Sequence, residues 1–129
     1  MEPISLDTLI AELLEKAEGT NAARAARTLH GGSGHALRQT VIALLAGADL
    51  SDHEGPGEAT VQVLRGQVRL TMPGEEGSAV DCAAGDLLVV PDAVHGFEAV
   101  TDAVVLLTVA MVEQPSSRAA EQSSNRVAR

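Results

Sequence analysis

The side chains of this sequence that could do chemistry are two widely separated histidines, His53 and His95, and two glutamates near the first of them, Glu54 and Glu58. Divalent transition metals bind neutral imidazoles and carboxylates that converge in one closed pocket. The two histidines come from different segments, so the fold has to bring them together. They indicate a metal site, a hydrogen-bonded histidine pair in a metal-free pocket, or histidines that line a ligand site.

The local backbone decides whether either glutamate joins the histidines. Alternate residues of a strand face the same side, and Glu54 and Glu58 are one residue out of phase with His53. A bulge at residues 55–57 would turn one of them toward the histidines. A regular backbone would leave both as solvated carboxylates, which is the arrangement we expect.

The remaining candidates, His30, His35 and Cys82, are expected to have no chemical role. The two histidines flank a loop dense in glycine and serine, where exposed side chains are the ordinary outcome. That loop has no lysine and no phosphate-binding pattern. Cys82 is the single cysteine, and no basic residue adjoins it to lower its pKa. We therefore predict an inert, packed thiol.

Short runs of aliphatic and β-branched residues alternate with turn signals from residue 38 onward. They predict strands at 38–46, 60–65, 67–72, 78–82, 87–91, 95–100 and 103–111. Gly66 is expected to form a tight hairpin between two of these strands. Many short strands at this spacing indicate a β-sandwich or a β-barrel.

Residues 4–18 predict an amphipathic helix, because apolar residues recur at the helical spacing. Ser5 is the expected N-cap, and Gly19 the expected stop. We favour a helix docked on the main domain over a helix that makes a dimer contact. Residues 22–29 fit either a helix or a first strand.

Arg38 and Gln39 open the first clear strand, and alternation requires that one of them face inward. An inward arginine in an apolar interior would need an anionic partner, which would indicate a carboxylate ligand. We expect instead that Arg38 lies in solvent at the end of the strand.

Composition excludes several classes of partner. The net charge is −9, so the chain repels phosphate backbones and anionic membranes. Phe97 is the single aromatic residue, which argues against stacking on single-stranded nucleic acid. No apolar stretch has the length of a membrane span, and the start lacks the pattern of a signal peptide. We expect no nucleic-acid or membrane partner, and a cytoplasmic location.

Two segments, residues 47–66 and 85–95, resemble the two sequence motifs of the cupin family. The first opens with the family's glycine-to-histidine spacing at Gly47 and His53, and it ends at the expected glycine. The second has the family's glycine-to-proline spacing, and it ends at His95. The resemblance covers most of the chain. It implies an all-β fold, a cupin-like jelly-roll β-barrel, here with an added N-terminal helix.

The sequence departs from the family pattern at two expected metal ligands. Gly55 stands where a second histidine is usual, and Ala59 stands where a glutamate is usual. His95 is also one residue closer to the motif's proline than the pattern has it. The resemblance therefore implies a partly erased site, with His53 and His95 as ligands of a weakly bound divalent metal such as Zn, Fe, Mn or Ni.

The resemblance also implies a pocket at the mouth of the barrel, with His53 and His95 as its polar groups and an aliphatic lining that includes Val61, Val63 and Phe97. We predict a cupin-like small-molecule binding module. The alternative is a metal-dependent cupin enzyme, of oxygenase or isomerase type, that acts on a small organic substrate. Small cupins are often dimers, so a homodimer is expected.

These expectations divide the chain into three parts. Residues 1–20 would hold the helix packed on the barrel, and residues 21–113 would form the cupin-like β-barrel. Residues 114–129 are polar and lack any apolar periodicity, so they are expected to be a disordered tail.

Overall fold

The computed structural model describes residues 1–53, 58–72, 78–90 and 95–111, and for residues 51–53 and His95 it describes the backbone alone. The predicted tail lies outside these residues. The described part contains one helix and nine strands: α1 (Leu6–Glu18), β1 (Arg24–His30), β2 (Leu37–Leu44), β3 (Asp49–His53), β4 (Glu58–Arg65), β5 (Gln67–Thr71), β6 (Ala79–Ala83), β7 (Leu87–Val89), β8 (His95–Ala99) and β9 (Ala103–Ala110). Within it, no helix has the length and hydropathy needed to cross a membrane.

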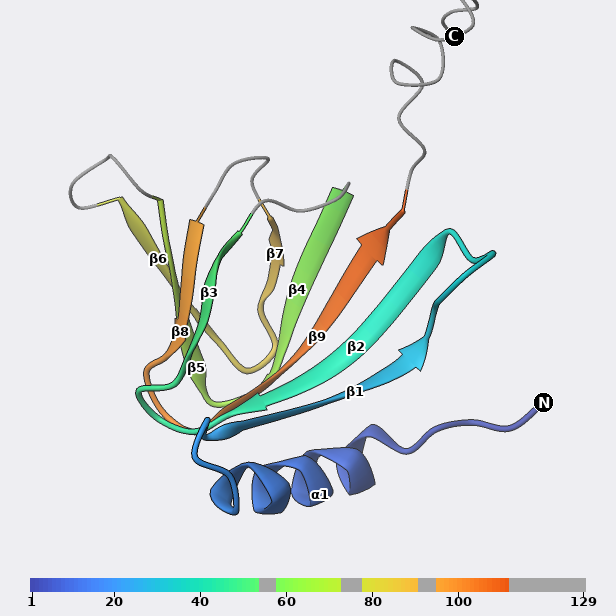
Figure 1. The fold of residues 1–129 in the computed structure, drawn as a ribbon. Coiled ribbons are helices and arrows are strands. Elements are labelled where there is room, and N and C mark those ends of the chain that lie inside the picture. Colours follow the sequence, from blue (N-terminus) through green and yellow to red (C-terminus); the bar gives the residue numbers. More distant parts are fainter. Residues whose placement is uncertain (54–57, 73–77, 91–94, 112–129) are drawn as a thin grey trace, which may run out of the picture.

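The strands form two antiparallel sheets that face each other (Figure 1). Sheet A has the order β1-β2-β9-β4-β7, and sheet B has the order β3-β8-β5-β6. The predicted all-β jelly roll with an N-terminal helix is therefore confirmed. In the part of the chain that the structure describes, strand pairing does not close the two sheets into one continuous barrel.

Four of the connections by which the chain passes from one sheet to the other lie together at one end of the sandwich (Figure 1). We call this the closed end; its connections are residues 45–48, 66, 84–86 and 100–102. Hydrogen bonds join one connection to the next. The Asp102 carboxylate accepts a bond from the Ala46 amide at 2.8 Å, and the Thr101 hydroxyl accepts one from the Gln67 amide at 3.1 Å. The strand ends at the opposite end, which we call the open end, are spread further apart (Figure 1).

Gly66 was expected to form a hairpin, and that prediction is wrong. The strands on either side of it belong to different sheets, because β4 pairs with β7 and β9, whereas β5 pairs with β6 and β8. Gly66 is instead a corner of the sandwich. Its φ of +81° lies in the left-handed region that favours glycine.

The central strands of sheet A are buried on both faces. On β2, Ile42 and Leu44 belong to the core between the sheets, whereas Val41 and Ala43 pack under the helix. Burial on both faces explains the uninterrupted apolar runs of β2 and β9. We call the face of each sheet that points toward the other sheet its inner face.

Helix α1 covers the outer face of sheet A over β1 and β2 (Figure 1). Its buried face consists of Leu9, Ile10, Leu13 and Ala17. The Ser5 hydroxyl accepts a hydrogen bond from the Thr8 amide at 3.2 Å, and Gly19 caps the other end. The predicted N-cap and the predicted stop are therefore confirmed, and the helix begins at Leu6 rather than at residue 4.

Two strands were not predicted outright. β1 resolves the ambiguity at residues 22–29 in favour of a strand, and β3 was not expected at all. β3 has the polar sequence Asp-Leu-Ser-Asp-His, and its pairing with β8 holds it in the sheet. The seven predicted strands are present, with ends within two residues of the expected ones.

Candidate functional site

His53 and His95 are register partners at the open end of the sandwich. His53 is the last residue of β3, and His95 is the first residue of β8, its antiparallel neighbour in sheet B (Figure 1). Two histidines that are 42 positions apart in the sequence are thus brought opposite each other. The structure describes the backbones of these two residues but not their side chains.

A β-bulge in β3 creates this pairing. Leu50 pairs with Phe97, and His53 pairs with His95, so three steps along β3 correspond to two steps along β8. Phe97 lies in the core between the sheets, and Leu50 packs against that core. In a regular antiparallel pair, position 52 would lie opposite His95. Because of the bulge, His53 lies opposite His95 instead.

The three apolar residues of the predicted pocket, Val61, Val63 and Phe97, all lie in the core between the sheets. Val63 is 1% exposed and lies toward the closed end, whereas Val61 and Phe97 are 5% and 7% exposed. β4 contributes the two valines from sheet A, and β8 contributes the phenylalanine from sheet B.

The described residues do not supply the donor set of the metal centre that the resemblance implies. Ala59 precedes Val61 by two residues on β4, so it lies on the inner face where the family's glutamate would lie, and its methyl group cannot bind a metal. Glu58 is exposed, as expected. Gly55 and Glu54 lie outside the described residues. Among the side chains that the structure describes, no three His, Cys, Asp or Glu residues form a metal-binding group.

Arg38 lies on the inner face of sheet A at the open end. It alternates with Thr40 and Ile42 along a regular stretch of β2, and Ile42 belongs to the core between the sheets. The predicted exposure of Arg38 at the strand end is confirmed. Arg38, Val109 and Ala59 form a row across β2, β9 and β4. This row could not be predicted from the sequence, because it depends on the register of the three strands.

Two threonines on the same face were missed by the sequence analysis. Thr28 on β1 pairs with Thr40 on β2, and their hydroxyl oxygens are 3.3 Å apart. Strand alternation from Ile42 would have placed Thr40 on this face, but nothing in the sequence identified its partner.

The other candidate residues of the sequence are His30, His35 and Cys82. The rings of His30 and His35 meet edge to face with centroids 4.8 Å apart, and both residues are exposed. Cys82 is 7% exposed, and burial, followed by the charges of Asp86 and Asp81, raises the pKa of its thiol. The expectation of a packed thiol is confirmed.

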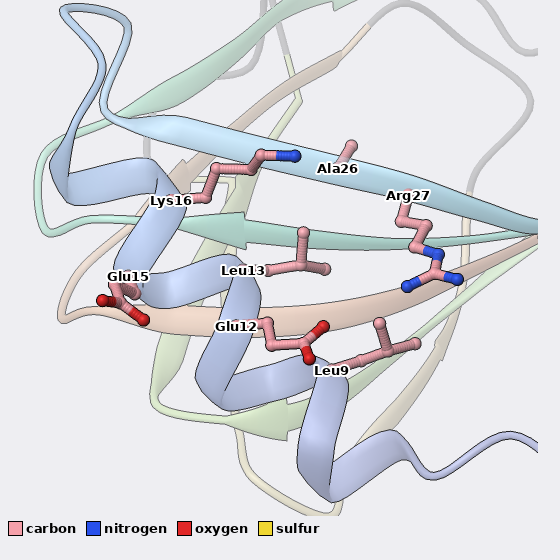
Figure 2. Close-up of a pocket in the computed structure, with 7 residues that line it drawn as sticks. All are labelled: Leu9, Glu12, Leu13, Glu15, Lys16, Ala26 and Arg27. Carbon is pink, nitrogen blue, oxygen red and sulfur yellow. The ribbon is translucent and has the colours of Figure 1, made fainter.

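A surface groove with a volume of about 450 Å³ lies between α1 and β1 (Figure 2). Its floor is apolar, and its rim carries Glu12 and Glu15 from the helix, Lys16 from the same helix and Arg27 from β1. Arg27 alternates with Ala26, and it shares the outer face of sheet A with the helix. The groove is therefore on the opposite face of sheet A from the row that contains Arg38.

The two facing antiparallel sheets, their order and the helix on one of them define the class of the molecule, a jelly-roll β-sandwich. Several solved structures with a similar fold are described as cupins. A cupin superfamily protein from Desulfitobacterium hafniense matches with a TM-score of 0.67 at 18% identity, over 86% of this chain and 92% of that one. The chain thus has the fold of small cupin proteins.

Two further structures are more similar in sequence. An RmlC-like cupin from Desulfovibrio desulfuricans is 27% identical, with a TM-score of 0.58 over 68% of this chain and 82% of that one. A conserved protein of unknown function from Streptococcus pyogenes is 29% identical, with a TM-score of 0.62 over 74% and 80% of the two chains. No family model matches the sequence, and no curated protein matches it.

Proposed function

We propose that this protein binds a small organic molecule at the open end, between the two sheets, with His53 and His95 as polar groups of the site. The register pairing of these two histidines carries the proposal. Directly opposed residues of antiparallel strands have Cβ atoms about 4.5–5.5 Å apart on the same face. His95 is two residues from Phe97 on β8, and Phe97 belongs to the core between the sheets, so the proposal has the pair on the inner face.

The walls around this position support a ligand with an apolar body. Val61 and Leu107 pair across β4 and β9, and Val109 pairs with Ala59 one row closer to the open end. Phe97 faces them from sheet B. Apolar walls with a few convergent polar groups are typical of small-molecule sites.

A metal-dependent enzyme of oxygenase or isomerase type is the second candidate. The observation that favours it is the same histidine pair, since two adjacent imidazoles can bind one transition-metal ion. Ala59 argues against it, because it removes the carboxylate that would complete the donor set. We therefore rank the binding module first.

A pair of double variants tests the proposal. In wild-type protein purified without a tag, we expect a library of small organic compounds to give binders in ligand-observed NMR. His53→Gln combined with His95→Gln should abolish the binding of most of them. His30→Gln combined with His35→Gln is the matched control, because it makes the same chemical change at two exposed loop histidines. That control should retain the binders.

Two results would contradict this ranking. If both double variants bind the same compounds as the wild type, the histidine pair is not part of a binding site. If near-stoichiometric iron, manganese, nickel or zinc survives dialysis against a chelator, as measured by elemental analysis, the metal-dependent enzyme becomes the better proposal.

The homodimer stays a prediction from the family resemblance. Size-exclusion chromatography with light scattering measures it directly. A molar mass near 13.3 kDa would mean a monomer, and twice that value would mean the expected dimer.

A further inference from the structure

We propose that the molecule bound at the open end carries a carboxylate, and that Arg38 is the residue that pairs with it. This inference rests on the proposed function, because it specifies the ligand class of that same site. Arg38 is not among the residues that the cupin resemblance implies, because β2 lies outside both motif segments.

The strand register places Arg38 in the row that contains Ala59. Arg38 pairs with Val109 on one side of β9, and Ala59 pairs with Val109 on the other side. Adjacent strands are about 4.8 Å apart, so the backbones of Arg38 and Ala59 are separated by about 10 Å. All three residues belong to the inner face, as the alternation with Ile42 and Val61 requires.

The alanine at position 59 changes the charge of this row. A glutamate there would face the site from the same row as Arg38 and would offset its charge. With Ala59, the row has a single charged side chain, and it is positive. Among the described residues, Arg38 takes part in no ion pair, whereas Arg69 pairs with Asp81 on the outer face of sheet B. The replacement thus favours an anion where the family pattern favours a cation.

The surroundings of Arg38 restrict its side chain. A Cβ atom at Gly31 would lie 3.0 Å from Cγ and 3.2 Å from Cβ of Arg38, so the glycine backbone packs directly on the arginine stem. Thr40, the next inner-face residue of β2, has its hydroxyl within 3.3 Å of that of Thr28. A stem held on one side loses less conformational entropy when the guanidinium binds a ligand.

The chemistry of the site favours a carboxylate over a phosphate. The planar guanidinium of arginine matches a carboxylate with two parallel hydrogen bonds. The remaining inner wall is aliphatic, with Val61, Leu107 and Val109, and suits a hydrocarbon body. The net charge of the chain is −9, and Arg38 is the one charged side chain of its row. One guanidinium group suits a ligand with one negative charge better than a phosphate monoester, which carries two.

The test uses two probes of the same shape, isobutyrate and its uncharged amide, isobutyramide. Each is titrated into ¹⁵N-labelled protein, and the amide shifts of residues in β2, β4 and β9 are followed. We expect the wild type to bind isobutyrate at least about tenfold more tightly than isobutyramide, the difference of a charge-assisted hydrogen bond. Arg38→Gln should weaken isobutyrate binding about tenfold and leave isobutyramide binding unchanged.

Arg27→Gln is the matched control. It removes the same charge from sheet A, but from the outer face beside α1. It should leave the binding of both probes as in the wild type. Arg38→Lys keeps the charge and removes the planar fork, so its affinity for isobutyrate should lie between those of Arg38→Gln and the wild type.

The outcomes separate this inference from the proposed function. Equal affinity for the two probes in the wild type would overturn the carboxylate and leave the binding site in place. Equal losses in Arg27→Gln and Arg38→Gln would show a general effect of net charge and would also overturn it. If neither probe shifts any open-end resonance, and the compound library gives no binder that depends on the histidine pair, both proposals fail.

Discussion

Gly66, in the β4–β5 corner, lies directly against the backbone of Asp102, in the β8–β9 corner. A Cβ atom at position 66 would collide with the Asp102 carbonyl oxygen and would lie 2.8 Å from the Cα atom of Ala103. The contact joins two of the four connections of the closed end. Those connections fix the strands whose other ends carry the candidate site, so the closed end positions the site from a distance.

Gly66→Ala should therefore destabilise the protein strongly. The change adds left-handed backbone strain, which costs about 1–3 kcal/mol, to a clash with backbone atoms that have no side-chain freedom. We expect the free energy of unfolding, measured by urea denaturation, to fall by about 3 kcal/mol or more.

Gly47→Ala is the control that adds left-handed backbone strain without a clash between a Cβ atom and neighbouring backbone. Gly47 has a similar φ of +89°, but a Cβ atom there would meet no described atom within 4 Å. This variant should lose only about 1 kcal/mol. Equal losses in the two variants would show that backbone strain alone, rather than the contact with Asp102, makes position 66 require glycine.

The ion pair between Arg69 and Asp81 predicts a contribution to stability that disappears in acid. The Arg69 side chain hydrogen-bonds the Asp81 carboxylate at 2.7 Å and holds its pKa below the ordinary value of 3.8. A carboxylate with a lower pKa in the folded state stabilises the fold above its unfolded pKa and loses that effect as the pH falls through the folded pKa. Asp81→Asn should thus be less stable than the wild type at pH 7 and should converge with it below about pH 3.8.

The size of this effect should be small and sensitive to salt, because both side chains are about 40% exposed. Chemical denaturation at several pH values measures it. Arg69→Gln provides the control, since Asp81→Asn should have almost no pH-dependent effect in that background. A difference that persists once the pH is below the folded pKa of Asp81 would have to come from packing and not from charge.

Cys82 should react slowly with thiol reagents in the folded protein. Its side chain is 7% exposed, and burial raises its pKa, so both access and thiolate population are low. At pH 8 we expect the rate of alkylation by iodoacetamide to be at least about tenfold lower than in urea-unfolded protein. Equal rates in the two states, followed by mass spectrometry, would show that β6 opens readily at the edge of sheet B.

The sequence predicts the strands that bury two faces and misses β3, whose sequence is polar. β2 and β9 have uninterrupted apolar runs, because one face meets sheet B and the other meets α1. β3 is polar, and its strand conformation depends on pairing with β8, a contact of long range. Turn composition identified Gly66 as a turn, but composition does not record which sheet the next strand joins.

The candidate site could be predicted only as far as strand alternation allows. Alternation from Val61 places Ala59 on the inner face, and the register of β4 against β9 is unbroken between these two residues. The pairing of His53 with His95 depends on a bulge after Leu50, and no glycine in β3 marks that bulge in the sequence. The row that joins Arg38 to Ala59 depends on the register of three strands, which no local pattern specifies.

Restoring the missing carboxylate should convert the site from one that favours anions to one that binds metal. Ala59→Glu would place a carboxylate on the inner face of sheet A, opposite the sheet that carries His53 and His95. Two imidazoles and one carboxylate are a common ligand set for divalent transition metals. We expect affinity for Zn²⁺, measured by competition with a chromogenic chelator, to rise at least about tenfold relative to the wild type. Affinity for isobutyrate should fall, because the new carboxylate lies in the row of Arg38.

Ala59→Gln is the control for this change, since it adds nearly the same volume at a partly buried position without the charge. It should leave Zn²⁺ affinity near the wild-type value, although both variants should lose some stability from crowding of the interior. The gain in Ala59→Glu should also vanish when His53 and His95 are both changed to glutamine. If the gain survives that change, the added carboxylate recruits metal with other groups, and the two histidines do not face the site that Ala59 faces. If Ala59→Glu and Ala59→Gln bind Zn²⁺ equally, a carboxylate at position 59 does not complete a metal site with the two histidines.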